Sequence, residues 1–268
     1  MIKNLLVVLC FAVFLGSVAV AVDPADDVHA RFDQIQRAMA GDRTAIDALA
    51  AEDPANPKFQ FIVGAALARL GQLEEATVAL QRSIRLGDDM AGLVLAEIFF
   101  DDRQYLEAFA WAQFWVQSNF TLEEIQRGEA NSDLGVGLLR YLLGRLDDEE
   151  IRLAERHAGY LLNEWLGDVE KQTSACIQPQ EICRQWTATR RRPPPYPMTM
   201  GDRGWTGFSR LVYLVDESGR VADQVVLHAS HPHFGSSAER GLRRWRFESS
   251  AAEPAPVLMQ ASVIFELQ

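Results

Sequence analysis

Hydrophobic positions are spaced differently in the two parts of this 268-residue chain. In the first part they recur as on a helix: Val28, Phe32, Ile35 and Met39 stand at i, i+4, i+7 and i+11, the spacing of one buried stripe. Beyond residue 200 they follow the spacing of strands. The pattern predicts an α+β fold, with an N-terminal signal helix, an all-α domain and a small ββαβ domain at the C-terminus.

The order of elements in the last part is predicted from short signals. Phe208–Val215 is a run of β-formers, and Asp216–Gly219 supplies a turn with Gly where a positive φ is needed. Val221 to Ala229 resume an extended segment. Ser236 and Glu239 form a capping box that predicts the start of a short helix, with an apolar stripe of Ala238, Leu242 and Trp245.

The final segment alternates between apolar and polar residues. The positions expected to face the core are Val257, Met259, Ala261, Val263, Phe265 and Leu267. Gln260, Ser262 and Glu266 are expected to face the other way. One helix and about three strands leave one buried face and two open sheet edges, and open edges pair with other chains. We therefore expect a docking module.

Helical periodicity continues through the front part after a boundary at Asn56-Pro57. A segment rich in Ala and Leu between Gly64 and Ala76 is followed about 32 residues later by a similar one, between Leu95 and Ala108. A third version is expected from Leu138 onward. Paired helices at this period resemble tetratricopeptide-like repeats, in which neighbouring hairpins bury each other and a concave face binds partners. A helical bundle that acts only as a spacer is the alternative.

The N-terminus predicts export. Lys3 precedes an apolar run from Leu5 to Val22, and Ala19-Val20-Ala21 has the small-x-small pattern of a cleavage site. Residues 1–21 are therefore predicted to be a signal peptide that is cleaved after Ala21, leaving a periplasmic protein. An uncleaved anchor is the alternative, because the run is near the short end of the roughly 17–25 residues that span a bilayer. The protein would then lie in the inner membrane, single-pass and facing the periplasm.

Cysteine and charge agree with this picture. Cys176 and Cys183 are expected to form a disulfide in an oxidising compartment, which would contribute roughly 2.5 kcal/mol to the stability of the fold.

The two parts of the chain differ in charge. Residues 22–189 carry 29 acidic and 15 basic side chains, whereas residues 190–268 carry 8 acidic and 10 basic ones. The acidic front part argues against nucleic acid or anionic lipid as its partner. The predicted domains are residues 22–170, a linker with the disulfide loop at 171–192, and residues 193–268.

No sequence motif points to catalysis. The chain lacks a Gly-x-Ser-x-Gly elbow, a phosphate-binding loop and a dinucleotide fingerprint, so we expect no enzyme and no cofactor. His228, His231 and His233 are clustered, but no Asp, Glu or Cys within three residues completes a metal site. We expect loop histidines and no metal; a zinc-assisted hydrolase is the alternative. Trp245 and Phe247 are expected to pack in the core.

The C-terminal segment resembles the C-terminal domain of TonB-type energy transducers over about 75 residues. The residues that carry the resemblance are Tyr196-Pro197, Gly207, Asp216-x-x-Gly219-x-Val221, Ser230-x-Pro232, Ala238, Arg244-Trp245-Arg246-Phe247, Pro256-Val257 and Phe265-Glu266-Leu267. A Pro common after the Trp-x-Phe motif is absent, and Glu253-Pro254-Ala255 replaces a Gly-containing turn.

The resemblance implies a protein that docks an extended peptide of an outer-membrane transporter by adding it to a sheet edge. We expect Val257 to Leu267 to be that edge. A membrane-anchored energy transducer, which would also contact inner-membrane motor proteins, is one alternative, and a periplasmic repeat scaffold without a transport role is another. The family's anchor typically carries a His, which this apolar run lacks. The stretch Pro193 to Pro197 spans only about 15 Å as polyproline II.

Overall fold

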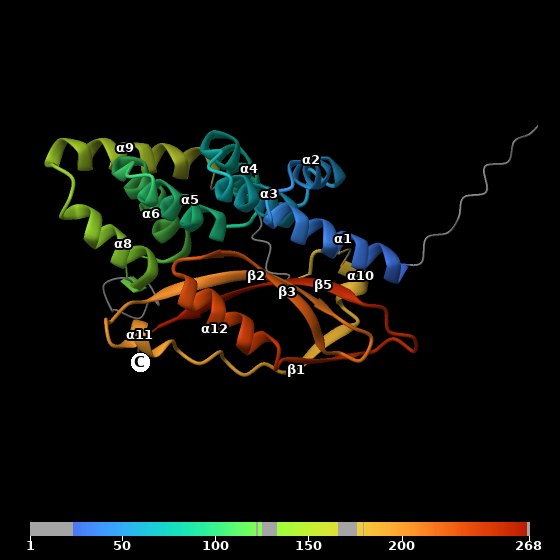
Figure 1. Ribbon diagram of the computed structural model, residues 1–268. Helices are drawn as coiled ribbons and strands as arrows, with labels where there is room; N and C mark the ends of the chain where they lie inside the picture. Colours follow the sequence, from blue (N-terminus) through green and yellow to red (C-terminus); the bar gives the residue numbers. More distant parts are fainter. Residues whose placement is uncertain (1–23, 122, 125–132, 166–175, 179, 267–268) are drawn as a thin grey trace, which may run out of the picture.

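The structure, a computed structural model, describes residues 24–121, 123–124, 133–165, 176–178 and 180–266. The predicted signal peptide or anchor, residues 1–21, lies outside this part of the chain. Helices form one layer, and a small sheet with one main helix forms a second layer beneath it (Figure 1). The predicted α+β class is confirmed. No helix in the described residues is both long and apolar enough to span a bilayer.

The upper layer consists of helices that pack largely on their neighbours in sequence, which supports the prediction of helical repeats. Their bounds are α1 Pro24–Met39, α2 Arg43–Glu52, α3 Pro57–Arg69, α4 Leu73–Arg85, α5 Met90–Asp101, α6 Tyr105–Asn119, α8 Asp133–Leu143 and α9 Asp148–Trp165. Asn56 caps α3 by accepting a hydrogen bond from the Lys58 N–H at 3.0 Å. Gly64 lets α3 approach α4 closely, because a Cβ there would lie 2.6 Å from Leu80.

The lower layer is built on a three-stranded antiparallel sheet in the order β3-β2-β5. Its strands are β2 Gly207–Val215, β3 Val221–Ala229 and β5 Val257–Phe265. Helix α12, Pro232–Leu242, covers one face. A second pair of strands joins β1, Trp186–Arg190, to β4, Arg246–Ser249. The remaining short helices are α10 Gln180–Cys183 and α11 Met198–Gly201.

Both faces of the three-stranded sheet are buried, so the prediction of a single buried face was wrong. Phe208, Val212 and Leu258 pack into the core of the helical layer, whereas Tyr213, Val257 and Met259 pack beneath α12. Gln260, which was expected to face solvent, is 4% exposed. Strand alternation separates the two faces of a sheet but does not reveal that another domain covers the second one.

Helix α12 begins earlier than predicted. It starts at Pro232, after the N-cap His231, whose side chain accepts a hydrogen bond from the His233 N–H at 3.2 Å. Pro suits the first position of a helix because its missing N–H has no partner there and its φ is already helical. The proposed capping box at Ser236 was wrong. Trp245 lies beyond the helix end, although its side chain is buried.

The Pro-rich segment of residues 191–197, called the strap below, lies along α12. Ser237 Oγ donates to the Pro195 carbonyl, and Trp245 Nε1 donates to the Arg192 carbonyl at 3.0 Å. Gly241 permits the close approach, because a Cβ there would lie 2.4 Å from the Pro194 ring. Part of the segment expected as a linker, Trp186–Arg190, forms β1 and pairs with β4. The strap is therefore packed on the domain that follows it.

Candidate docking edge

The two edges of the three-stranded sheet differ in regularity. Strand β5 pairs with β2 from Val257 to Phe265 without a register shift. The ladder between β3 and β2 has two shifts, one near Leu211 and one near Val215. Bulges twist an edge and leave residues unpaired, which hinders further pairing. Arg69 Nη2 also donates to the Val226 carbonyl of β3 at 2.7 Å. Edge β5 is therefore the better template for a guest strand.

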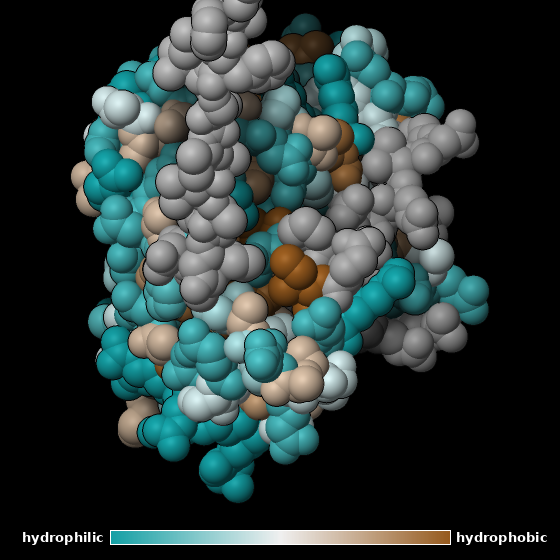
Figure 2. Space-filling view, turned by 90° about the vertical axis from the view of Figure 1, so that its right-hand side faces the viewer, coloured by the Kyte–Doolittle hydropathy of each residue, from teal (hydrophilic) through white to brown (hydrophobic). Residues whose placement is uncertain are grey.

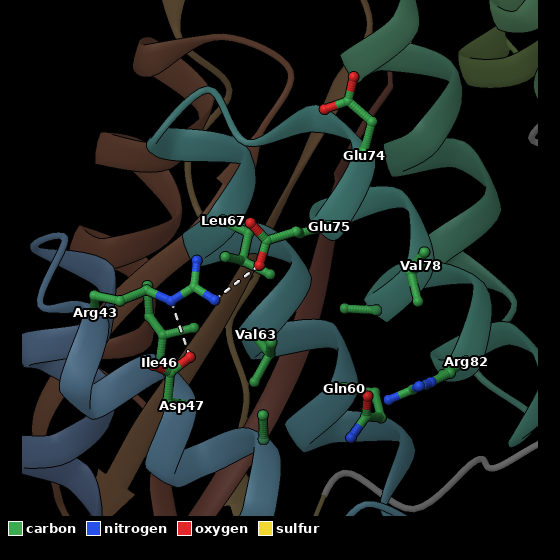
Figure 3. Close-up of a pocket in the computed structure, with 12 residues that line it drawn as sticks. Arg43, Ile46, Asp47, Gln60, Val63, Leu67, Glu74, Glu75, Val78 and Arg82 are labelled. Carbon is green, nitrogen blue, oxygen red and sulfur yellow. Dashed lines mark hydrogen bonds and ion pairs between the residues drawn. The ribbon is translucent and has the colours of Figure 1, made fainter.

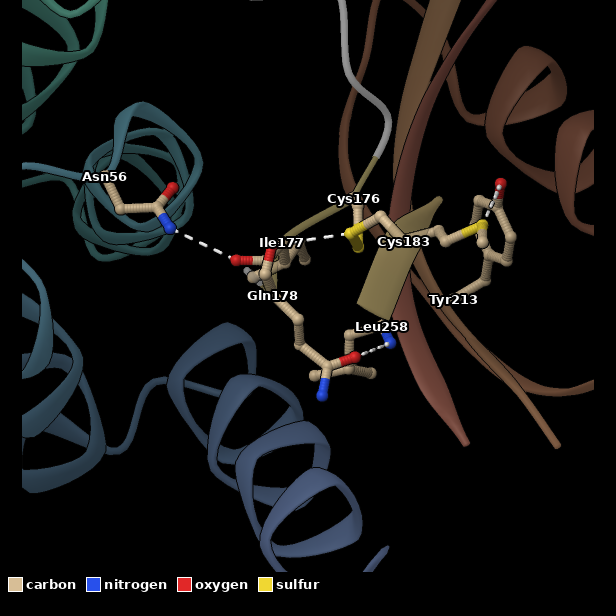
Figure 4. The surroundings of a disulfide bond; sticks show 8 residues. Asn56, Cys176, Ile177, Gln178, Cys183, Tyr213 and Leu258 are labelled. Atoms are coloured by element: carbon tan, nitrogen blue, oxygen red, sulfur yellow. Dashed lines mark hydrogen bonds between the residues drawn. A yellow bond between two sulfur atoms is a disulfide. The ribbon is translucent and has the colours of Figure 1, made fainter. Parts of the chain in front are cut away.

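The backbone of Leu258 shows which residues of β5 face outward. Its N–H donates to Gln178 Oε1 at 3.0 Å, and its carbonyl accepts from the Ile177 N–H at 3.1 Å (Figure 4). Both groups therefore point away from β2. Because the direction of N–H and C=O alternates along an antiparallel strand, Gln260, Ser262 and Ile264 direct their backbone groups outward as well.

A disulfide loop holds the protein's own segment at one end of this edge. Cys176 and Cys183 form the predicted disulfide, with their Cα atoms 5.7 Å apart. Cys176 forms an antiparallel bridge with Met259. Asn56 of the helical layer donates through Nδ2 to the Ile177 carbonyl at 3.2 Å (Figure 4). The predicted acceptor edge is thus partly occupied near Val257–Met259, and Gln260 to Ile264 form the part that extends beyond the loop.

Side chains along this stretch differ in what they offer. Ser262 is exposed and Ile264 is 46% exposed, whereas Phe208, which pairs with Ile264 on β2, is fully buried. Gln260 is buried, and its carboxamide oxygen accepts from Nε and Nη2 of Arg210, the latter at 2.8 Å. Ala261, Val263 and Phe265 face the α12 core. Of these residues, Ser262 and Ile264 present accessible side chains.

Several residues that carry the family resemblance form an aromatic cluster beneath the sheet. Phe234 stacks on Phe265 with ring centroids 5.0 Å apart, and Tyr196 lies edge-on to both, at 6.0 and 6.1 Å. The Tyr196 hydroxyl donates to the Trp205 carbonyl. Gly207 is required here, because a Cβ would lie 2.2 Å from the Phe234 ring. Pro197 follows Tyr196 directly and is the N-cap of α11.

A second cluster lies at the other end of the domain. Trp245 and Phe247 are buried, and both rings lie 6.0 Å from the ring of Tyr213. Burial raises the pKa of the Tyr213 hydroxyl far above its ordinary value, although the charge of Arg191 opposes this. Gly219, at φ +76°, lies against the Phe247 carbonyl, and its own carbonyl accepts from the Phe247 N–H at 2.8 Å. The two clusters hold α12 and β4 against β2.

A buried ion pair joins the two layers, and the sequence analysis did not identify it. Arg210 of β2 donates to Asp88, in the loop between α4 and α5, at 2.7 and 2.5 Å. The Arg210 guanidinium also lies 3.9 Å from the ring centroid of Phe61. Burial lowers the pKa of nearby Lys58, an effect that Asp88 opposes and Arg210 reinforces. The sequence signal for this ion pair is the presence of an Arg within the apolar run Phe208–Val215, where a buried charge needs a partner.

The three clustered histidines have separate roles. His228 lies in β3, where its Nε2 is 2.6 Å from Glu97 Oε2 of α5, and Ser230 Oγ donates to the other oxygen of Glu97 at 2.7 Å. His231 caps α12, and burial, reinforced by His233 and Arg203, lowers its pKa. Within the described residues, no group of three or more His, Cys, Asp or Glu side chains is arranged to hold a metal ion.

The helical layer contains a cavity of about 330 Å³ between α2, α3 and α4 (Figure 3). Its apolar lining includes Ile46, Val63 and Val78. At one side Arg43 donates to Asp47 at 2.9 Å and to Glu75 at 2.8 Å (Figure 3). The cavity is therefore lined by apolar side chains, and the charged side chains at this side of it form ion pairs with one another.

The fold is a small α+β domain, with an open sheet edge at β5, joined to a layer of helices. Residues 192–267 match the family model of the Gram-negative bacterial TonB protein C-terminal domain, which confirms the resemblance for that part of the chain. Among solved structures, the chain is similar to the "Solution NMR structure of Pseudomonas aeruginosa TonB CTD". The sequence identity is 22%, the match covers 31% of this chain and 88% of that chain, and the TM-score is 0.30. No curated protein matches the chain.

Proposed function

We propose that this protein is a periplasmic TonB-like adaptor that docks an extended peptide of an outer-membrane transporter, or of another protein partner, on β5. The main support is the unbroken β5 ladder, whose outward backbone groups continue from Leu258 through Gln260, Ser262 and Ile264. The family match of residues 192–267 supports a TonB-like role in general. The domain acts by binding and not as an enzyme.

The guest strand gains affinity from two sources. Each outward residue of β5 offers one N–H and one C=O, and a hydrogen bond contributes a net ~0.5–1.5 kcal/mol. A few such bonds give weak binding once the entropy of ordering a peptide is subtracted. A partner with an apolar side chain placed over Ile264 would add burial, since that side chain is 46% exposed. The backbone therefore sets the direction of the guest, and Ile264 favours an apolar side chain.

The disulfide loop sets one limit of the site. The bridge between Cys176 and Met259 occupies the start of the edge. A guest strand on Gln260 to Ile264 ends where this bridge begins, unless it displaces Ile177 and Gln178. Because Asn56 also holds Ile177, the helical layer helps to keep this limit in place. The length of the bound segment is therefore set by the protein itself.

A proline substitution tests the edge. Synthetic peptides that tile the periplasmic segments of outer-membrane transporters are titrated against Ser262→Pro and Ser262→Ala. Pro removes the outward N–H, so we expect Ser262→Pro to abolish binding and Ser262→Ala to retain it. Circular dichroism and a thermal scan show whether the Pro variant is folded. Unchanged affinity in a folded Pro variant would exclude this edge.

Whether the apolar N-terminal run is cleaved decides whether the protein is a periplasmic adaptor or a membrane-anchored transducer. We propose that cleavage after Ala21 releases the protein into the periplasm. N-terminal sequencing of the protein recovered from cells separates the two: a start at Val22 supports the adaptor, and an intact Leu5 to Val22 run supports a single-pass protein of the inner membrane.

The cavity in the helical layer favours a second candidate, a periplasmic repeat scaffold that binds its partner between α2, α3 and α4. Val63→Trp fills this cavity, whereas Ser262→Pro blocks the edge. A partner that is lost only with Val63→Trp would support the scaffold without a transport role.

A further inference from the structure

Eight arginines gather on the side of the C-terminal domain that faces away from the helical layer. This arginine face consists of Arg190, Arg191, Arg192, Arg220, Arg240, Arg243, Arg244 and Arg246. They come from β1, the strap, the end of α12, β4 and the turn before β3, which lie along the lower side of the domain in Figure 1. Seven are exposed and Arg246 is half-buried. The lower part of the surface in Figure 2 is accordingly hydrophilic.

The arrangement costs folding free energy. Arg190 lies directly opposite Arg246 in the ladder of β1 and β4, and Arg220 is bridged to Arg246 from the other side. Like charges at opposed strand positions are destabilising. In the described part of the chain, no arginine of this face forms an ion pair with a carboxylate, although Glu239 and Glu248 are close in sequence. The Asp216 carboxylate, which accepts from the Arg220 N–H, offsets part of the charge of Arg220, so the positive charge of the other seven arginines is available to an external anion.

Two arginines of this face are held in place by Trp245. Arg191 lies over the Trp245 ring, 4.6 Å from the ring centroid. This cation–π contact leaves the guanidinium at the surface while it restricts the side chain. Arg246 donates through Nη1 to the carbonyl of Trp245 at 2.6 Å. Ordering of this kind lowers the entropy that a bound anion would otherwise cost.

We propose that the arginine face binds the surface of an anionic phospholipid bilayer. Guanidinium groups bind phosphate through two parallel hydrogen bonds, so arginine is suited to phospholipid headgroups. The arginines are spread over five neighbouring segments, which matches a flat surface better than the narrow contact with an acidic peptide. Met198 of α11, at the end of the strap, is 83% exposed and adds an apolar contact at the bilayer surface.

Charge on the rest of the protein favours one orientation. Residues 22–189 carry 29 acidic and 15 basic side chains, and their helical layer covers the opposite face of the sheet. An anionic surface repels that layer and attracts the arginine face, so the molecule turns its C-terminal domain toward the bilayer. Edge β5 lies at the side of the sheet and stays accessible in this orientation. The attraction acts only near the surface, because charges are screened within about 8 Å at physiological salt.

Vesicle co-sedimentation tests the proposal with the chain that begins at Val22, so that the apolar N-terminal run takes no part. Vesicles of phosphatidylcholine alone are compared with vesicles that contain phosphatidylglycerol. We expect binding to the anionic vesicles only, and a decrease as salt is raised. Arg240→Gln with Arg244→Gln should weaken binding about 5-fold for each arginine removed. The matched control, Arg140→Gln with Arg152→Gln, removes two exposed arginines of the helical layer and should leave binding unchanged or only slightly weaker.

A second variant separates binding from folding. Arg190→Gln removes one of the opposed charges, so its melting temperature should equal or exceed that of the unchanged chain while its vesicle affinity falls. A decrease in both the melting temperature and the vesicle affinity would indicate that Arg190 has a structural role, and it would overturn the proposal. Equal binding to neutral and anionic vesicles, or binding to polyglutamate without binding to anionic vesicles, would overturn it too; the latter result would indicate an acidic protein partner.

Discussion

Arg210 and Asp88 form a two-pronged ion pair across the seam between the sheet and the helical layer, at 2.7 and 2.5 Å, and each side chain is at most 8% exposed. They are 122 positions apart in the sequence. Gln260 of β5 also contacts Arg210. The pair therefore joins β2 to the loop between α4 and α5, and through Gln260 it also reaches β5, the strand that carries the proposed docking edge.

Breaking this pair on one side is expected to be costly. Asp88→Asn leaves Arg210 and the nearby Lys58 buried without a carboxylate, which should lower the free energy of unfolding by roughly 3–5 kcal/mol. Urea denaturation measures the loss. Asp33→Asn is the control: it removes an exposed pair with Arg37 and should cost less than about 1 kcal/mol. Equal effects of the two substitutions would contradict a buried role for Asp88.

Gly219 and Gly71 allow steric overlap to be separated from backbone strain. Both have a positive φ, +76° and +72°. A Cβ on Gly219 would lie 1.9 Å from the Phe247 carbonyl oxygen, whereas a Cβ on Gly71 meets nothing within 4 Å. Gly71→Ala should cost about 1–2 kcal/mol from backbone strain alone. We expect Gly219→Ala to cost clearly more, as a larger drop in melting temperature, and a smaller drop would exclude the close contact with β4.

The disulfide is expected to control how much of the β5 edge is occupied. Cys176→Ser with Cys183→Ser should lower stability by roughly 2–3 kcal/mol, because the short loop is no longer constrained. The Leu258 amide, which donates to Gln178, should then exchange faster with solvent. Amide hydrogen exchange checks this, with Gln260 as the internal reference. An unchanged Leu258 rate would mean that Asn56 holds the segment without the disulfide.

An ion pair within the helical layer makes stability depend on pH. His157 of α9 lies 3.1 Å from Glu107 of α6, and this hydrogen bond raises the pKa of His157 although partial burial opposes it. Because the folded pKa lies above the unfolded one, the stabilisation is complete at pH below the ordinary His value. It is lost as the pH rises through the folded pKa. His157→Gln should therefore flatten the decrease in melting temperature between pH 5.5 and 8.

Short sequence signals predicted those elements whose ends are set by interactions between residues close together in the chain. The turn at Asp216–Gly219 and the strand ends around it follow from the residues themselves, as does the start of α3 at Asn56-Pro57. Ser236 was chosen as a helix cap because its motif fits, yet Pro232 three positions after Ala229 already begins the helix. Both signals were present in the sequence, and the structure uses the earlier one, with His231 as the N-cap and Pro232 at the first helical position.

The contacts between the layers were beyond the reach of sequence patterns. Gln260 is polar and alternates with apolar neighbours, so the pattern assigns it to solvent. Its burial against Arg210 depends on a helical layer that is distant in sequence. The pairing of Cys176 with Met259 is equally non-local. Such features require the fold, because no short-range spacing encodes which surface covers which strand.

Hydrogen exchange of the bound complex tests the central claim most directly. A peptide that binds the mature chain is added, and protection is measured at each amide of β5 and β3. We predict that the amides of Gln260, Ser262 and Ile264 become protected, while the neighbouring Ala261 and Val263, already bonded to β2, change little. Protection that appears on β3 or only around the α2–α4 cavity, with these three amides unchanged, would contradict strand addition at β5.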